Sequence, residues 1–158
     1  MDWQHLLHHT VCGAIAAAGF GVLFNMGYRT LIWCAASGAL AVGVRTICMQ
    51  LGWSLEAGSF AAALAVGSGV HLLSIYSDVP ADALDVAGYI PMVPGSFAAK
   101  AILGLFALTS SNLTDTTQTM NEAVQYTVRV LFTIGAIGTG LAIPTLLLRV
   151  RGVQKRHS

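Results

Sequence analysis

Five long apolar segments, separated by short polar stretches, dominate the pattern of hydrophobic and polar positions along the chain. They cover about residues 9–25, 30–49, 56–76, 94–108 and 123–148. A helix needs about 20 predominantly apolar residues to cross the hydrocarbon core of a bilayer. The Ser- and Thr-rich stretch 109–121 is predicted to be an aqueous loop. The pattern predicts an all-α integral membrane protein, with about five transmembrane helices in a single domain over residues 1–158.

Composition supports the membrane assignment. The chain is 55% hydrophobic and only 9% charged, with a mean hydropathy of +0.69, whereas a soluble domain carries about 25% charged residues. The net charge of +1 gives no reason to expect binding to nucleic acid.

The three cysteines, Cys12, Cys34 and Cys48, lie in apolar stretches and are interpreted as small packing residues rather than a disulfide framework. No basic region precedes the first segment, so we expect it to be a retained span rather than a cleaved signal peptide.

The distribution of basic residues predicts an orientation. Arg149, Arg151, Lys155 and Arg156 make up half of all Lys and Arg in the chain. Basic residues near span ends favour the cytoplasmic side. The C-terminus is therefore predicted to be cytoplasmic, and five spans then place the N-terminus on the outside.

Rows of small residues at a spacing of four predict close helix packing. Such rows let two backbones approach, and in lipid this contact drives helix association. The rows are Gly13, Ala17 and Gly21; Ala35, Ala39 and Gly43; Ala61, Ala65 and Gly69; and the shorter Ala136 and Gly140.

The run Ile90-Pro91-Met92-Val93-Pro94-Gly95 predicts a break in the helical structure before the fourth segment. Proline lacks the backbone donor, and the residue before a proline avoids helical angles. Pro94 suits the start of a new helix, whose amide groups and dipole would favour an anion. The segment is interpreted as a broken or re-entrant helix, and a plain loop leading into the fourth segment is the alternative.

Four basic side chains fall inside the apolar segments without an acidic residue beside them: Arg45, His71, Lys100 and Arg129. A buried cation needs a partner, such as a lipid phosphate, a carbonyl group, a second subunit or an anionic cargo. Snorkelling is the alternative for Arg45 and Arg129, and a core position is the alternative for His71. Lys100 follows the break by less than two turns and is the best single candidate for attracting a carboxylate.

Catalytic and cofactor signatures are absent from the sequence. There is no phosphate-binding loop of the G-x-x-x-x-G-K-[ST] type and no nucleophile with an adjacent base. His5, His8 and His9 resemble a metal cluster only weakly, because no cysteine or carboxylate joins them at a useful spacing. We therefore expect neither an enzyme nor a bound metal or cofactor.

Several short motifs together resemble the small, YjjB-type subunit of the threonine/serine exporter (ThrE) family. They are Gly19-Phe20-Gly21-Val22-Leu23-Phe24-Asn25 followed by Arg29, Trp33-Cys34-Ala35, Gly43-Val44-Arg45 and Ile90-Pro91-Met92-Val93-Pro94-Gly95. The resemblance implies export of small carboxylates across the bacterial inner membrane: threonine and serine in full-length members, dicarboxylates such as succinate in split ones. It also implies that a larger YjjP-type subunit works with the short chain.

Position by position, the resemblance implies a role in substrate handling for Asn25, Arg29, Arg45, Pro91, Pro94 and Gly95. Lys100 stands where the family pattern leads us to expect a polar residue other than lysine. The chain is thus predicted to be a subunit of a secondary exporter that contacts membrane lipid and assembles with the larger subunit or with further copies of itself. A structural or regulatory scaffold is the competing hypothesis, and it is favoured if the internal cations and the Pro-Gly break face lipid or a subunit contact.

Overall fold

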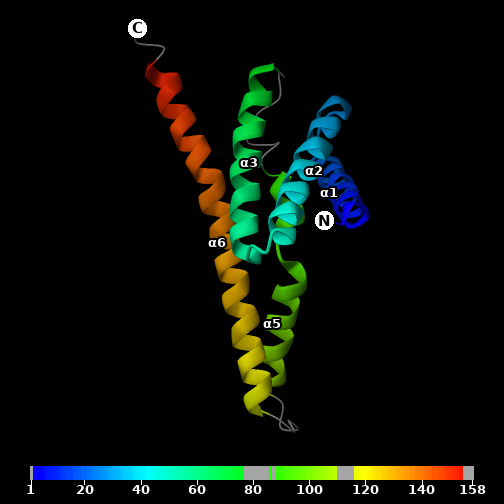
Figure 1. The fold of residues 1–158 in the computed structure, drawn as a ribbon, viewed down its shortest axis with the longest axis vertical. Coiled ribbons are helices and arrows are strands. Elements are labelled where there is room, and N and C mark those ends of the chain that lie inside the picture. The colour runs from blue at the N-terminus through cyan, green and yellow to red at the C-terminus, as the bar shows by residue number, and fades with distance from the viewer. Residues whose placement is uncertain (1, 77–85, 87, 110–115, 155–158) are drawn as a thin grey trace. The chain divides into compact units, whose positions relative to one another are not determined.

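The computed structural model describes residues 2–76, 86, 88–109 and 116–154, and within these ranges every regular element is helical (Figure 1). The elements are α1 (Trp3–Leu23), α2 (Tyr28–Gln50), α3 (Leu55–Tyr76), the 3-10 turn η1 (Ile90–Met92), α5 (Gly95–Ala107) and α6 (Thr116–Gln154). The all-α fold class is confirmed.

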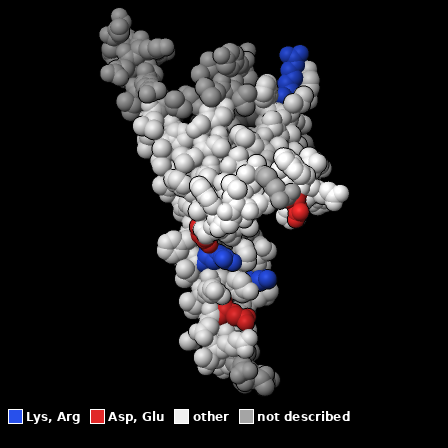
Figure 2. Space-filling model, in the orientation of Figure 1, with Lys and Arg blue, Asp and Glu red and all other residues white. Residues whose placement is uncertain are grey.

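Three helices in the described part are long and apolar enough to cross a bilayer: α1, α2 and the stretch Thr116–Leu147 of α6. Shorter apolar helical stretches cover Leu55–Val70 in α3 and Gly95–Ala107 in α5. The 13 residues of α5 extend for about 20 Å at 1.5 Å per residue, less than the roughly 30 Å hydrocarbon core. The face in Figure 2 carries few charged side chains among a broad uncharged surface. The chain is a membrane protein.

The predicted loop over residues 109–121 is wrong in its second half. Helix α6 begins at Thr116, so its first six residues, TTQTMN, are helical despite their polarity. Apolar content identifies the part of a helix that lies in lipid, whereas polar residues such as Gln and Glu also have a good helix propensity. At the other end, Pro144 lies inside α6 without ending it.

The first of two compact units comprises Met1–Met92 and Ala136–Ser158. Its core contains Cys34, Ala41, Ala62, Ala63, Val66, Val70, Met92 and Ile137. Helices α1 and α2 form an antiparallel hairpin: a Cβ atom on Gly13 would lie 3.1 Å from the carbonyl oxygen of Gly38, and one on Gly21 would lie 3.3 Å from the sulfur of Cys34. The predicted row of Gly13, Ala17 and Gly21 is buried along its whole length, as expected.

The rows predicted on the second and third segments are displaced from the faces that pack most closely. In α2 the buried positions include Cys34, Gly38 and Ala41 rather than Ala35 and Ala39. In α3, Ala62, Ala63 and Val66 are buried, while Ala61, Ala65 and Gly69 are only partly buried. Small residues are so frequent in these helices that several registers satisfy the same spacing. Gly140 of α6 does pack as predicted, because a Cβ there would lie 2.7 Å from that of Ala63.

The second unit, Val93–Gly135, contains α5 and the N-terminal part of α6. These helices approach closely at Gly104, where a Cβ would lie 2.8 Å from that of Ala123. The ring of Phe97, two turns before Gly104 in α5, stacks on that of Tyr126, one turn after Ala123 in α6, with centroids 5.9 Å apart. The unit is therefore a helical hairpin whose helices meet through a small-residue contact, an aromatic pair and the cation–π contacts of Lys100 and Arg129.

We expect the two ends of α6 to lie on opposite sides of the membrane. Its 39 residues extend for about 58 Å at 1.5 Å per residue, nearly twice the hydrocarbon thickness. Single cysteines replacing Thr117 and Gln154, in a chain without its native cysteines, should react with an impermeant maleimide from opposite sides. Labelling of both positions from one side would contradict this topology.

Candidate functional site

A cavity of about 480 Å³ lies in the first unit. Its walls come from α1, α2 and η1, and the lining residues are His5, His9, Val42, Arg45, Thr46, Met49, Gln50 and Pro91. Three of these side chains are basic and none is a carboxylate. Two of the residues predicted from the sequence, Arg45 and Pro91, meet in this cavity, so its chemistry favours an anion.

Arg45 links the cavity to the broken segment. Its Nη1 donates a hydrogen bond of 2.8 Å to the carbonyl oxygen of Met92, across 47 residues of sequence. Met92 is fully buried, so this bond satisfies a carbonyl group that a regular helix would have satisfied internally. A guanidinium carries five N–H donors in a planar fork. The bond to Met92 uses one of these donors, so the other N–H groups of Arg45 can donate to a carboxylate in the cavity.

The α1 wall contributes two histidines one helical turn apart. The ring centroids of His5 and His9 are 4.2 Å apart, with the planes tilted by 42°. His8 does not line the cavity, and its Nδ1 lies 3.9 Å from the sulfur of Cys12. Across the described ranges, no three His, Cys, Asp or Glu side chains are arranged to hold a metal ion.

The predicted break before α5 is present, and the protein supports it. Pro94 has φ −79° and ψ 62°, the values of an inverse γ-turn, and the N–H of Gly95 donates a 2.8 Å hydrogen bond to the carbonyl oxygen of Val93. The first α-helical bond of α5 joins the N–H of Ala98 to the carbonyl of Pro94 at 3.0 Å. η1 itself contacts both α1 and α2.

This geometry corrects one expectation about the start of α5. The amide of Gly95 is used by the γ-turn, so it is not one of the free donors that the sequence predicted. A Cβ atom on Gly95 would also meet no atom within 4 Å. The chain itself therefore does not require glycine at this position, and the close approach occurs instead at Gly88, where a Cβ would lie 2.9 Å from the Oγ of Ser37.

Asn25 and Arg29 lie at the other end of the α1–α2 hairpin. Asn25 is exposed and adopts a positive φ of 55° in the connecting turn, a conformation that asparagine tolerates better than most residues. Arg29 is exposed, and its Nε donates to the hydroxyl oxygen of Tyr28 at 3.1 Å. Sixteen positions along α2 separate Arg29 from Arg45, about 24 Å at 1.5 Å per residue. The structure does not bring this pair into the cavity.

Lys100 belongs to the second unit and has different surroundings. Its Nζ lies 5.4 Å from the ring centroid of Tyr126. The cavity that it lines, of about 400 Å³, also includes the carboxylate-bearing Glu122. In the same hairpin, the guanidinium carbon of Arg129 lies 5.3 Å from the ring centroid of Phe97. An acidic neighbour weakens the case for Lys100 as an anion site.

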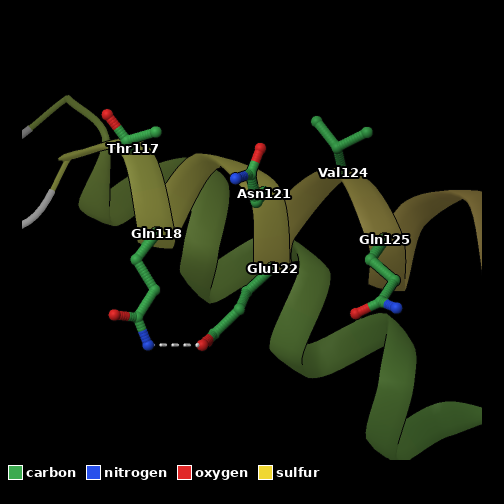
Figure 3. A pocket seen from close by; sticks show the side chains of 6 residues that line it. All are labelled: Thr117, Gln118, Asn121, Glu122, Val124 and Gln125. Carbon is green, nitrogen blue, oxygen red and sulfur yellow. Dashed lines mark hydrogen bonds between the residues drawn. The ribbon is translucent and has the colours of Figure 1, made fainter.

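A third cavity, of about 640 Å³, is a shallow surface on α6 alone (Figure 3). It is lined by Thr117, Gln118, Asn121, Glu122, Val124 and Gln125. The only charged lining residue is Glu122, whose Oε1 accepts a 3.2 Å hydrogen bond from Nε2 of Gln118. This cavity is larger than the one lined by Arg45 and Pro91, which we call the Arg45 cavity. Its acidic character, however, does not suit a carboxylate.

Sequence reasoning missed four polar contributors to the Arg45 cavity: His5, His9, Thr46 and Gln50. The spacing of His5 and His9 places both on one face of α1, and that signal was available. Gln50 was not predictable, because it is held by a contact 48 residues away, a 3.4 Å bond from its Nε2 to the carbonyl oxygen of Asp2. The side chain of His71, the fourth internal cation, lies outside the described part of the structure.

Membrane transporters place broken helices beside their binding sites, and the apolar helices of this chain form a basic cavity that includes Pro91 of the broken segment. The family is defined by the sequence: residues 9–147 match the family described as threonine/serine exporter, ThrE. The chain belongs to this family, as its motifs predicted, and is a threonine/serine exporter-type membrane transport protein. No solved structure matches the chain.

Proposed function

We propose that the chain is the small membrane subunit of a secondary exporter for small carboxylates, either dicarboxylates such as succinate or the amino acids threonine and serine. The observation that carries this proposal is the Arg45 cavity, which contains three basic side chains and no acidic one. A guanidinium fork matches the two oxygens of a carboxylate. Inside a membrane protein the attraction between the two charges is also stronger than in water.

Arg45 is the proposed carboxylate ligand, and Pro91 contributes to the wall of the same cavity. Pro94 and Gly95 end the broken segment and start α5, so their proposed role is to allow this segment to move during transport. Asn25 and Arg29 are exposed at the α1–α2 turn, where we propose that they meet lipid headgroups or another subunit. Lys100 is retained only as a secondary site.

The proposed assembly is with a larger YjjP-type subunit, or with further copies of this chain, in the bacterial inner membrane with the C-terminus in the cytoplasm. The length of α5 supports a partner, because 13 residues do not cross the hydrocarbon core. Large apolar side chains of α5, such as Leu103 and Phe106, are two-thirds exposed. Lipid alone or a second subunit can cover such side chains.

A scaffold role is the second candidate, and one observation favours it. Arg45 already donates to the carbonyl of Met92, so its charge has a structural use even without cargo. In that case the larger subunit would hold the whole pathway, and this chain would only hold the broken segment in place.

Reconstitution distinguishes the two functions. Proteoliposomes are prepared with this chain, with the larger subunit, or with both, and the efflux of labelled succinate and threonine is measured. We expect efflux only when both subunits are present, and loss of efflux with an Arg45 variant. Full efflux by the larger subunit alone would establish the scaffold role, and transport by a monomer of this chain would contradict the proposed assembly.

A further inference from the structure

The His5–His9 pair is the part of the cavity that neither the carboxylate site nor the broken segment explains. We propose that a carboxylate entering the Arg45 cavity is bound together with a proton, which is taken up by the His5–His9 pair. The pair is thus a proton site and a second set of ligands for the anion. This inference rests on the proposed carboxylate site and extends it.

The first argument is the charge of the empty cavity. The ring centroids of His5 and His9 are 4.2 Å apart, and Arg45 lines the same space. Neighbouring charges of like sign disfavour one another. Arg45 is always charged, so the two imidazoles share the cavity with a cation that no lining carboxylate neutralises.

The second argument is the set of charges that face the pair from each neighbouring element. On α1 this is His8, whose ring centroid is 5.9 Å from that of His9, and at the N-cap of α1 it is the exposed Asp2, three residues before His5. On α2 the only charged side chain lining the cavity is Arg45, and η1 consists of Ile90, Pro91 and Met92, none of which titrates. No carboxylate of the described residues lines the cavity, so a bound anion supplies the missing negative charge.

The two binding events are therefore linked. A carboxylate between Arg45 and the imidazoles removes the repulsion and favours a protonated histidine. By reciprocity, the proton raises the affinity for the anion by the same factor. Histidine changes its charge between about pH 5 and 8. Affinity for the carboxylate should be highest at the acidic end of this range and should fall as the pH rises, as the pair loses its proton.

The chain provides a matched control for this linkage. His8 is the immediate neighbour of His9, but it contacts Cys12 and does not line the cavity. All three histidines are exposed on α1, so glutamine should be accommodated at each of them. His5→Gln and His9→Gln remove the proposed proton site, whereas His8→Gln removes a similar imidazole from outside it.

Calorimetric titration tests the inference on the full chain, with the larger subunit co-purified, in nanodiscs of zwitterionic lipid that keep anionic headgroups out of the cavity. Succinate and threonine are titrated at several pH values, in buffers with different ionisation enthalpies that reveal proton uptake. We expect affinity to fall about tenfold from pH 6 to 8, with proton uptake on binding. His5→Gln and His9→Gln should bind with little pH dependence and little proton uptake, while His8→Gln should behave as the unmodified chain.

Three results would overturn the inference. One is binding whose affinity does not change with pH and that takes up no proton, which would leave the carboxylate site intact. Another is a loss of pH dependence in His8→Gln as large as in His9→Gln. Absence of binding at every pH would overturn the proposed carboxylate site itself, and the inference with it.

Discussion

Arg45→Gln is expected to lower carboxylate export by at least about tenfold, and to lower succinate export more than threonine export. A hydrogen bond to a charged group contributes about 1.5–3 kcal/mol, and about 1.4 kcal/mol corresponds to a factor of ten. A dicarboxylate carries a second negative charge that a nearby cation also attracts, whereas the ammonium group of threonine is not attracted to that cation. The measurement is efflux from cells or proteoliposomes, with the amount of protein matched by immunoblot.

The same substitution also removes the hydrogen bond to the carbonyl of Met92, so a control must separate charge from structure. Gly88→Ala provides it: the added Cβ would lie 2.9 Å from the Oγ of Ser37 and 3.1 Å from Cγ1 of Val66, which disturbs the same segment without changing any charge. We expect Gly88→Ala to reduce both substrates equally. Equal losses for both substrates in Arg45→Gln as well would show that Arg45 acts only by holding the segment.

The features predicted correctly from the sequence are those that depend on neighbouring residues. A proline restricts its own φ and removes its own N–H, so Pro91 and Pro94 identify the break without any knowledge of the tertiary structure. The apolar helices are likewise visible, because the requirement for about 20 apolar residues is a property of one continuous segment. The start of α6 was missed because its first two turns are polar, and lipid does not determine where a helix ends in water.

Features that depend on the register between helices were not predictable. Lys100 stands closer to the break in sequence than Arg45, so the sequence alone favours Lys100 as the anion ligand. The structure instead gives Lys100 an acidic neighbour, Glu122, from a helix 22 positions further along the chain. Arg45 meets His9 because α1 and α2 are antiparallel, and a shift of one turn along that hairpin would separate them. Composition contains no information about such a shift when small residues satisfy several registers.

Gly38 is the position where a single added side chain should have the largest effect on stability. A Cβ atom there would overlap that of Ala17 and would lie 2.7 Å from the carbonyl oxygen of Gly13. The obstructing atoms include backbone, so rotation of a side chain cannot relieve the clash. Overpacking of this kind usually costs about 1–3 kcal/mol, and we expect Gly38→Val to cost about 3 kcal/mol, at the upper end, because close approach of small residues drives helix association in lipid. The measurement is the midpoint of thermal unfolding in detergent, together with the fraction of protein that remains monodisperse.

Gly19→Val is the matched control for this prediction. Gly19 lies in α1 of the same hairpin, it is exposed, and a Cβ there would meet no atom within 4 Å. Both substitutions place a β-branched residue inside a transmembrane helix, so they share any intrinsic effect on helix propensity. The difference between them measures the α1–α2 contact alone. A similar midpoint for the two variants would mean that the helices of this hairpin do not approach each other at Gly38. The shape of the Arg45 cavity would then also be in doubt, since that hairpin provides most of its walls.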